Sequence, residues 1–194
     1  YVSFSKFRYN SEVGIKVDYG DAVNINNCDI YNNYRGIEIY IDQSESQNGE
    51  IIKYNIIRDN SPKGGGETNG NFSNNIIKNN TYSDTYYHDE AGGIKCRPGN
   101  FNHNTITGNT GGEAALFLDN DSHEVTNNII ANNDSAQPAV MIDDDGPTIF
   151  SRNIIVGKTK FEEISLRDNS SYTNNIFAGG LVGKFEYDNN WTQT

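Results

Sequence analysis

One short phrase recurs along the chain and constrains its fold more than any other feature. The phrase is Asn-Ile-Ile or a close variant, and its second apolar residue serves as the anchor for aligning the copies. Successive anchors lie 20 to 29 residues apart, at Ile30, Ile57, Ile77, Ile106, Ile130, Ile155 and Phe177. Two residues before each anchor stands an Asn, except before the first, where Cys28 takes its place. Five residues before each anchor stands a large apolar residue, from Ile25 to Tyr172. These fixed offsets identify a repeat protein.

After its anchor, most units contain a second phrase in which apolar and polar residues alternate. These phrases are GIKV (14–17), GIEIYI (36–41), GGIKCR (92–97), ALFL (115–118), AVMI (139–142) and EISL (163–166). Alternation with a period of two is typical of a strand with one buried face. One unit therefore holds three short strands joined by polar turns. The sequence predicts an all-β solenoid, a parallel β-helix of about seven to eight coils that pair at about 4.8 Å.

Asparagine is the commonest residue, and the repeat gives it a structural role. A sharp turn between strands needs a residue that tolerates a left-handed backbone, which Asn does better than other non-glycine residues. Stacked once per coil, the side-chain amides can also hydrogen-bond along the stack. We therefore expect the Asn before each anchor to occupy such a turn and to form a ladder.

The amino-acid composition narrows the classes of binding partner that the chain can have. Only 35% of the 194 residues are hydrophobic, but these residues recur regularly and are mostly β-branched or aromatic, which favours an ordered β protein. A net charge of −11 argues against nucleic acid or an anionic membrane as partner. No apolar run is long enough to span a bilayer, so membrane insertion is not expected.

The chain begins at Tyr1 without Met or a signal peptide, and we interpret it as a single domain, 1–194, of a larger extracellular or cell-surface protein. Coils are expected over 4–180 and a cap over 181–194, with flanking domains or stacked neighbours at the open ends. Cys28 and Cys96 lie more than two coils apart, beyond disulfide reach, and are expected to be buried free thiols.

The phrase N-x-I-x-x-N, the Asn ladder and the triple short strands resemble the right-handed parallel β-helix of the pectate-lyase-like superfamily over residues 4–180. The resemblance implies that the G-I-x-I phrases form the first sheet, whose outer face usually makes the substrate cleft. It is specific for fold and not for function, because lyases, hydrolases, epimerases, tailspikes and adhesins share it. The style of the sequence also resembles β-helix domains associated with methanogen disaggregatases, which act on a chondroitin-like cell coat.

Alternation predicts which residues of the first sheet point outward. The expected outward file is Lys16, Glu38, Glu67, Lys95, Phe117, Met141 and Ser165, beside an inward file that ends at Ile164. One turn departs from the pattern, because Ile77 and Ile94 are seventeen residues apart where most coils use seven to ten. The excess, TYSDTYYHDE, would emerge beside the outer face, and loops on rigid scaffolds tend to carry function. The glycines of 64–66 leave room there for a ligand or another backbone.

In the first hypothesis the chain is a polysaccharide lyase that cleaves a uronic-acid-containing polysaccharide by β-elimination. This reaction needs a base, a group that neutralises the carboxylate, and a proton donor. Within the family the base is typically Lys or Arg, so we assign Lys95 as base and Arg97 as the carboxylate ligand. Tyr87 or His88 would donate the proton, or act as base in a Tyr/His variant. The expected substrate-binding residues are Glu38, Glu67, Tyr86, Asp89, Glu90 and Phe117.

Two alternatives remain open. The first alternative is a non-catalytic glycan-binding or structural module of a cell-surface protein. The second is a glycoside hydrolase, since Glu38 and Glu67 would face outward on successive coils about 4.8 Å apart. A further file of acids, Asp119, Asp143 and Asp168, could bind Ca²⁺, although acids at such positions can also cap tight turns.

Overall fold

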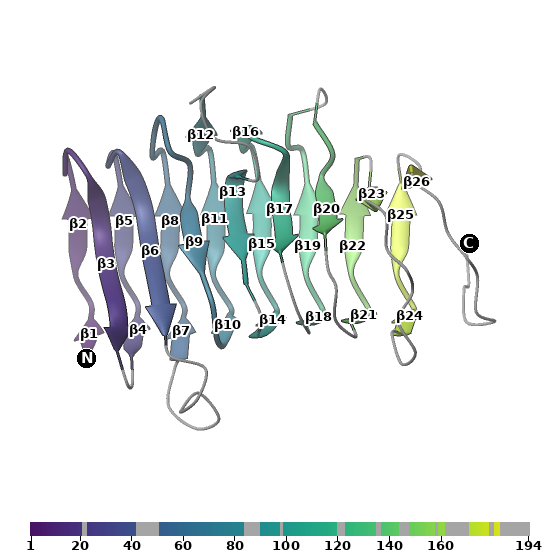
Figure 1. Ribbon diagram of the computed structural model, residues 1–194, viewed down its shortest axis with the longest axis horizontal. Helices are drawn as coiled ribbons and strands as arrows, with labels where there is room; N and C mark the ends of the chain where they lie inside the picture. The colour runs from purple at the N-terminus through teal and green to yellow at the C-terminus, as the bar shows by residue number, and fades with distance from the viewer. Residues whose placement is uncertain are drawn as a thin grey trace.

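The structure is a computed structural model, and it describes residues 1–20, 23–41, 51–83, 90–97, 99–119, 123–134, 137–143, 148–157, 159–161, 171–178 and 181–182. Three parallel sheets of eight strands each make up almost all of this part of the chain. Each coil contributes one strand to each sheet (Figure 1). We call the sheets A, B and C in the order in which each coil passes through them.

The strands of sheet A carry the apolar residue that precedes each anchor by five positions. They are β1 (Val2–Ser3), β4 (Asn24–Asn26), β7 (Ile51–Lys53), β10 (Phe72–Ser73), β14 (Gly99–Asn102), β18 (His123–Thr126), β21 (Thr148–Ser151) and β24 (Ser171–Thr173). The strands of sheet B carry the anchors. They are β2 (Lys6–Arg8), β5 (Asp29–Tyr31), β8 (Ile56–Arg58), β11 (Ile76–Lys78), β15 (Thr105–Thr107), β19 (Ile129–Ala131), β22 (Ile154–Val156) and β25 (Ile176–Ala178).

Sheet C contains the alternating phrases. Its strands are β3 (Val13–Gly20), β6 (Arg35–Ile41), β9 (Gly66–Thr68), β13 (Ala91–Cys96), β17 (Ala114–Asp119), β20 (Val140–Asp143), β23 (Thr159–Phe161) and β26 (Leu181–Val182). A two-stranded sheet of β12 (Thr81–Tyr82) and β16 (Thr110–Gly111) lies at the turn from sheet B to sheet C. Sheets B and C run in opposite directions across the coil (Figure 1). Within each sheet, strands of successive coils pair in parallel, which confirms the predicted parallel β-helix.

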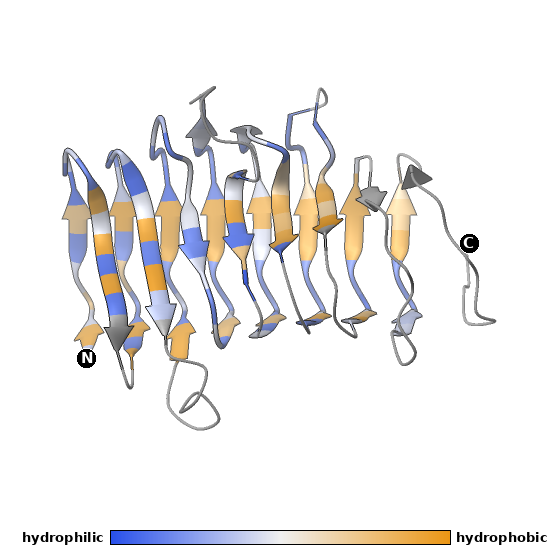
Figure 2. Cartoon of the chain, in the orientation of Figure 1, coloured by the Kyte–Doolittle hydropathy of each residue, from blue (hydrophilic) through white to orange (hydrophobic). Residues whose placement is uncertain are grey.

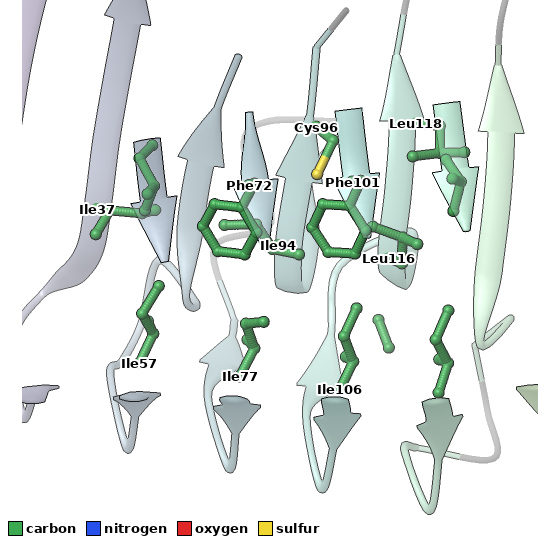
Figure 3. Packing of buried hydrophobic residues seen from close by; sticks show 14 of the residues in the cluster. Ile37, Ile57, Phe72, Ile77, Ile94, Cys96, Phe101, Ile106, Leu116 and Leu118 are labelled. Carbon is green, nitrogen blue, oxygen red and sulfur yellow. The ribbon is translucent and has the colours of Figure 1, made fainter. Parts of the chain in front are cut away.

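The core lies between the sheets and is built from stacked files of identical or similar residues. The anchors form one file in register, in which Ile77 pairs with Ile57 and with Ile106. Figure 3 shows these side chains facing the inward file of sheet C, which includes Ile37, Ile94 and Leu116. All six of these residues are completely buried. The orange bands in Figure 2 mark the same strands as the most hydrophobic parts of the chain.

The predicted ladder exists at the corner between sheets A and B. Its members are Asn55, Asn75, Asn104, Asn128, Asn153 and Asn175, all buried. Each carboxamide oxygen accepts from the previous member: Asn104 Oδ1 lies 2.9 Å from the backbone N and 3.2 Å from Nδ2 of Asn75. Asn104 Nδ2 also donates to the carbonyl oxygen of Phe72 at 3.0 Å. The ladder therefore satisfies backbone groups at a corner where sheet pairing cannot.

The left-handed conformation does not belong to the ladder Asn, contrary to expectation. It belongs to the residue just before it, as at Tyr54 (φ 58°), Asn74 (φ 55°) and Asn127 (φ 58°). The preceding residue turns the chain, which leaves the ladder Asn free to point into the core. A second ladder, at the corner between sheets B and C, was not predicted as such. It consists of Asn33, Asn60, Asn80, Asn109 and Asn133, bonded in the same way.

The glycines of 64–66 lie against a neighbouring backbone. A Cβ on Gly65 would collide with the carbonyl oxygen of Gly93, and a Cβ on Gly66 with that of Ile37. Of the two uses predicted for this stretch, the structure shows the close approach of another coil.

The prediction for the seventh coil was wrong. Its sheet C strand is β23, where Lys160 pairs with Met141 and Phe161 with Ile142, and not the phrase EISL. The segment 159–161 comes before 163–166 in the chain and pairs with Met141 and Ile142 of β20. It therefore occupies the sheet C position that was predicted for 163–166. Ile164 and Ser165 lie outside the described residues. Because β26 pairs with β23, sheet C continues through Val182, two residues into the expected cap.

The two cysteines are buried, and two histidines lie in different surroundings. Cys28 and Cys96 are buried free thiols, as predicted. Cys28 keeps the first ladder's backbone bond, because its N–H donates to Asn55 Oδ1 at 2.9 Å. His103 takes a left-handed turn conformation, whereas His123 is buried in β18. Within the described part of the chain, no helix has the length and apolar character needed to cross a membrane.

Candidate functional site

The outward file of sheet C is in register as predicted. Lys16 pairs with Glu38, Glu38 with Glu67, Glu67 with Lys95, and Lys95 with Phe117. Charged side chains from the neighbouring positions join this file on the outer face of sheet C. We call this set the charged wall; its members are Lys16, Arg35, Glu38, Tyr40, Glu67, Glu90, Lys95, Arg97 and Asp119.

Arg35 is the centre of the charged wall. Its guanidinium lies 3.0 Å from Glu38 Oε2, 3.9 Å from Glu67 Oε2 and 3.1 Å from Glu90 Oε1. Only 11% of the Arg35 side chain is exposed, so these ion pairs form in surroundings of low dielectric constant. Three carboxylates from two coils and one inter-strand turn thus meet around a single cation.

Glu67 is the most enclosed carboxylate of the wall, with 4% of its side chain exposed. The Tyr40 hydroxyl donates to its Oε2 at 2.6 Å, and Arg97 Nε donates to its Oε1. Burial opposes ionisation, but these hydrogen bonds outweigh it and lower the pKa of Glu67. Burial, followed by the bond to Glu67, raises the pKa of the Tyr40 hydroxyl. Glu67 is therefore a persistent anion and Tyr40 a persistent donor.

Glu90 is shifted in the opposite direction. Burial raises its pKa, and the ion pair with Arg35 offsets only part of that effect. Glu67 and Glu90 share Arg35, yet one carboxyl is held ionised while the other is more easily protonated than an ordinary Glu. Carboxyl pairs with pKa values moved apart are typical of acid and base roles in enzymes.

Lys95 and Phe117 point outward, but neither side chain is exposed to solvent. Lys95 Nζ lies 2.8 Å from Asp119 Oδ2, with 8% of its side chain exposed. Phe117 was expected to offer its ring to a sugar, but it is completely buried and packs with Ala91, Ala114 and Met141. That expectation is corrected: Phe117 lies in the outward file but is covered, with the Lys95 ammonium 5.2 Å from its ring centre.

The remaining predicted site residues are only partly described. Tyr86, Tyr87, His88 and Asp89 lie outside the described residues. Glu90, at the end of the same insertion, is described and pairs with Arg35 of the charged wall.

The acidic file predicted for Ca²⁺ is in register over two coils, since Asp119 pairs with Asp143. The carboxylate of Asp119, however, is bonded to Lys95. Asp168 falls outside the described ranges, and within those ranges no group of three or more His, Cys, Asp or Glu side chains could hold a metal ion.

Sequence reasoning missed Arg35 and Tyr40. Tyr40 could have been found by extending the outward alternation from Glu38 by one step. Arg35 could not, because strict alternation places it on the inward side with Ile37. Alternation breaks at Gly36, inside β6: its hypothetical Cβ would meet Ile57 in the core although the next residue, Ile37, is also buried there, and Arg35 before it reaches the outer face.

The charges of the wall balance within it. Lys16, Arg35, Lys95 and Arg97 each pair with a carboxylate of the wall or its edge. Such a surface presents fixed donors and acceptors and little net field, which suits polar ligands rich in hydroxyl groups.

Comparison with known proteins agrees with the fold. A family model described as a right handed beta helix region matches residues 1–110, more than half of the chain. Comparison with the curated proteins and with the solved structures gave no significant match. The matched coils include β3, β6, β9 and β13, which carry most of the charged wall. The chain belongs to the right-handed β-helix family.

Proposed function

We propose that the chain is a carbohydrate-active β-helix domain that cleaves a polysaccharide by hydrolysis at the charged wall. The observation that carries this proposal is the trio of carboxylates around Arg35, in which Glu67 and Glu90 have pKa values displaced in opposite directions. Glycoside hydrolysis requires one carboxyl group that gives up a proton and one that stays ionised.

The roles follow from the two environments. Glu90, with its raised pKa, donates a proton to the glycosidic oxygen as the leaving group departs. Glu67, held ionised by Tyr40 and Arg97, stabilises the positive charge that develops on the sugar ring. Glu38, in register beside Glu67 and more exposed, is placed to activate the attacking water. This revises the hydrolase hypothesis from the sequence by adding Glu90 as the acid.

A second function, β-elimination, is favoured by one specific observation. Lys95 and Arg97 lie on the same wall as Glu67, and Arg97 keeps 39% of its side chain exposed. In this reading Arg97 holds the uronate carboxylate, Lys95 removes the neighbouring proton after leaving Asp119, and Tyr87 or His88 protonates the leaving oxygen. Ca²⁺ held by Asp119, Asp143 and Asp168 belongs to the same proposal, as does secretion to the cell surface.

One set of assays separates these readings. The chain is incubated with polygalacturonate, chondroitin sulfate and xylan, with and without Ca²⁺, while new reducing ends and the ultraviolet absorbance of unsaturated sugars are followed. Reducing ends without absorbance, lost in Glu90→Gln and retained in Lys95→Ala, support hydrolysis. Absorbance that is lost in Lys95→Ala supports elimination. Binding without either product identifies a glycan-binding module and overturns both enzymatic proposals.

A further inference from the structure

A second surface with distinctive chemistry lies on sheet B, whose outer face is separate from the charged wall. Four residues form a file in register across β2, β5, β8 and β11: Arg8 pairs with Tyr31, Tyr31 with Arg58, and Arg58 with Lys78. Lys6 lies beside this file on β2 and is exposed. We call these five residues the basic strip.

The strip is held in place by its own contacts. The Arg58 guanidinium lies 4.2 Å from the centre of the Tyr31 ring and is bonded to both oxygens of Asp29, at 3.0 and 2.9 Å. Arg8 Nη1 donates to the Tyr31 hydroxyl at 3.2 Å. The neighbouring Tyr9 leaves 71% of its surface exposed. A flat aromatic ring thus borders a row of oriented cations.

The charge of this strip is opposite to that of the chain. The whole sequence has 26 acidic residues against 15 basic ones. The strip brings together four cations, and the acids bonded to Arg58 are Asp29 and Asp59. Farther along, the strands of sheet B carry no charged residue from β15 to β25, so the cations are gathered on one half of the face.

We propose that the basic strip binds an acidic polysaccharide, one that carries carboxylate or sulfate groups. Lys6 and Arg8 are exposed on the first coil, and the partly exposed Arg58 and Lys78 lie two and three coils farther along. These cations can therefore pair with anionic groups spaced along an extended polymer at multiples of the coil repeat of about 4.8 Å. The Tyr9 ring supplies an apolar face for a sugar ring, and the carboxylates of Asp29 and Asp59 can accept hydrogen bonds from sugar hydroxyls. A DNA strand has few hydroxyl groups to donate to these carboxylates, which makes it the poorer partner.

This inference does not rest on the proposed function, because the strip and the charged wall share no residue. It gives the molecule a site that anchors an acidic glycan whether or not the wall cleaves it.

The test compares two single charge reversals that change the net charge equally. Arg8→Glu alters the strip, whereas Arg152→Glu alters an exposed arginine at a turn farther along the solenoid. Binding of each variant to dextran sulfate, uncharged dextran and a single-stranded DNA oligonucleotide is measured at low ionic strength. We expect binding to dextran sulfate and not to dextran, with affinity reduced about tenfold by Arg8→Glu, little changed by Arg152→Glu, and decreasing as salt is added.

Several results would overturn the inference: no binding of dextran sulfate by the parent chain, an equal loss in both variants, or DNA bound as tightly as dextran sulfate. If Arg8→Glu does not fold, Lys78→Glu removes another cation of the same file and carries the same expectation. Glu90→Gln, which disables the proposed hydrolysis, should leave this binding unchanged, so the two proposals fail independently.

Discussion

Individual residues of the charged wall combine two properties that are costly together, charge and burial. A buried ion is tolerated when oppositely charged or hydrogen-bonding partners surround it. Removing one partner leaves the other charge buried without compensation, which is strongly destabilising. Glu67 is the clearest case, because it is enclosed and receives hydrogen bonds from Tyr40 and Arg97. Its stability effect can be measured separately from any catalysis.

We expect Glu67→Gln to lower the free energy of unfolding by about 2–4 kcal/mol, because Arg35 and Arg97 lose a buried counter-charge. Denaturant unfolding followed by circular dichroism measures this change. The matched control is Glu124→Gln, an exposed glutamate on β18, which should change stability by no more than about 0.5 kcal/mol. Equal effects of the two substitutions would show that the Glu67 ion pairs add nothing to stability.

The stabilisation by Glu67 should also depend on pH. Because folding lowers its pKa, the folded chain binds this proton less tightly than the unfolded chain does. The contribution is therefore fully present above the unfolded pKa of about 4.3 and is lost as pH falls through the lower folded value. The difference in unfolding free energy between the parent chain and Glu67→Gln should shrink as pH is lowered below about 4.3. A difference that stays constant down to acid unfolding would contradict this assignment.

At the scale of strands and corners, most of the fold could be predicted from the sequence. Fixed offsets from each anchor predicted two of the sheets, and alternation predicted the third sheet and its outward file, because parallel coils in register place equivalent residues in files. What could not be predicted arises where a corner breaks alternation. Arg35 reaches the outer face because alternation breaks at Gly36 inside β6, and the residue before each ladder Asn takes the left-handed conformation. In the seventh coil, two neighbouring segments were compatible with the sheet C strand, and the structure uses the first, Thr159–Phe161.

Two substitutions at the corners separate the role of the ladder Asn, which forms the hydrogen bonds, from that of the turn residues, which take the left-handed conformation. Asn104→Ala should lower the free energy of unfolding by at least about 3 kcal/mol, because it leaves the Asn75 N–H and the Phe72 carbonyl buried without their partner. Asn132→Gly changes an exposed turn Asn with φ 55°, where glycine is equally at ease, and should be nearly neutral. Thermal and denaturant unfolding of both variants measure the contrast. Similar losses in the two would mean that the amide ladder contributes no more than the turns.

At the scale of the whole molecule, the solenoid makes every coil depend on its immediate neighbours. Each internal coil is covered on two sides, whereas the first coil of this chain contacts other coils on one side (Figure 1). The core reflects this: Phe7 is only partly buried, whereas Phe101 is 2% exposed. The energetic effect of removing a core side chain should therefore depend on the position of its coil.

Phe101→Ala and Phe7→Ala test this dependence with the same chemical change. Phe101 stacks on Phe72 with ring centres 5.2 Å apart and planes 2° apart, so its loss should cost about 3–5 kcal/mol. Phe7→Ala should cost clearly less, because its ring is already partly exposed to water. Hydrogen exchange distinguishes the spatial reach of the two: Phe101→Ala should loosen coils on both sides, β10 and β18 included, whereas the effect of Phe7→Ala should be confined to the first two coils. Uniform loosening of the whole chain by either substitution would show that the solenoid unfolds as one cooperative unit and not through nearest-neighbour coupling.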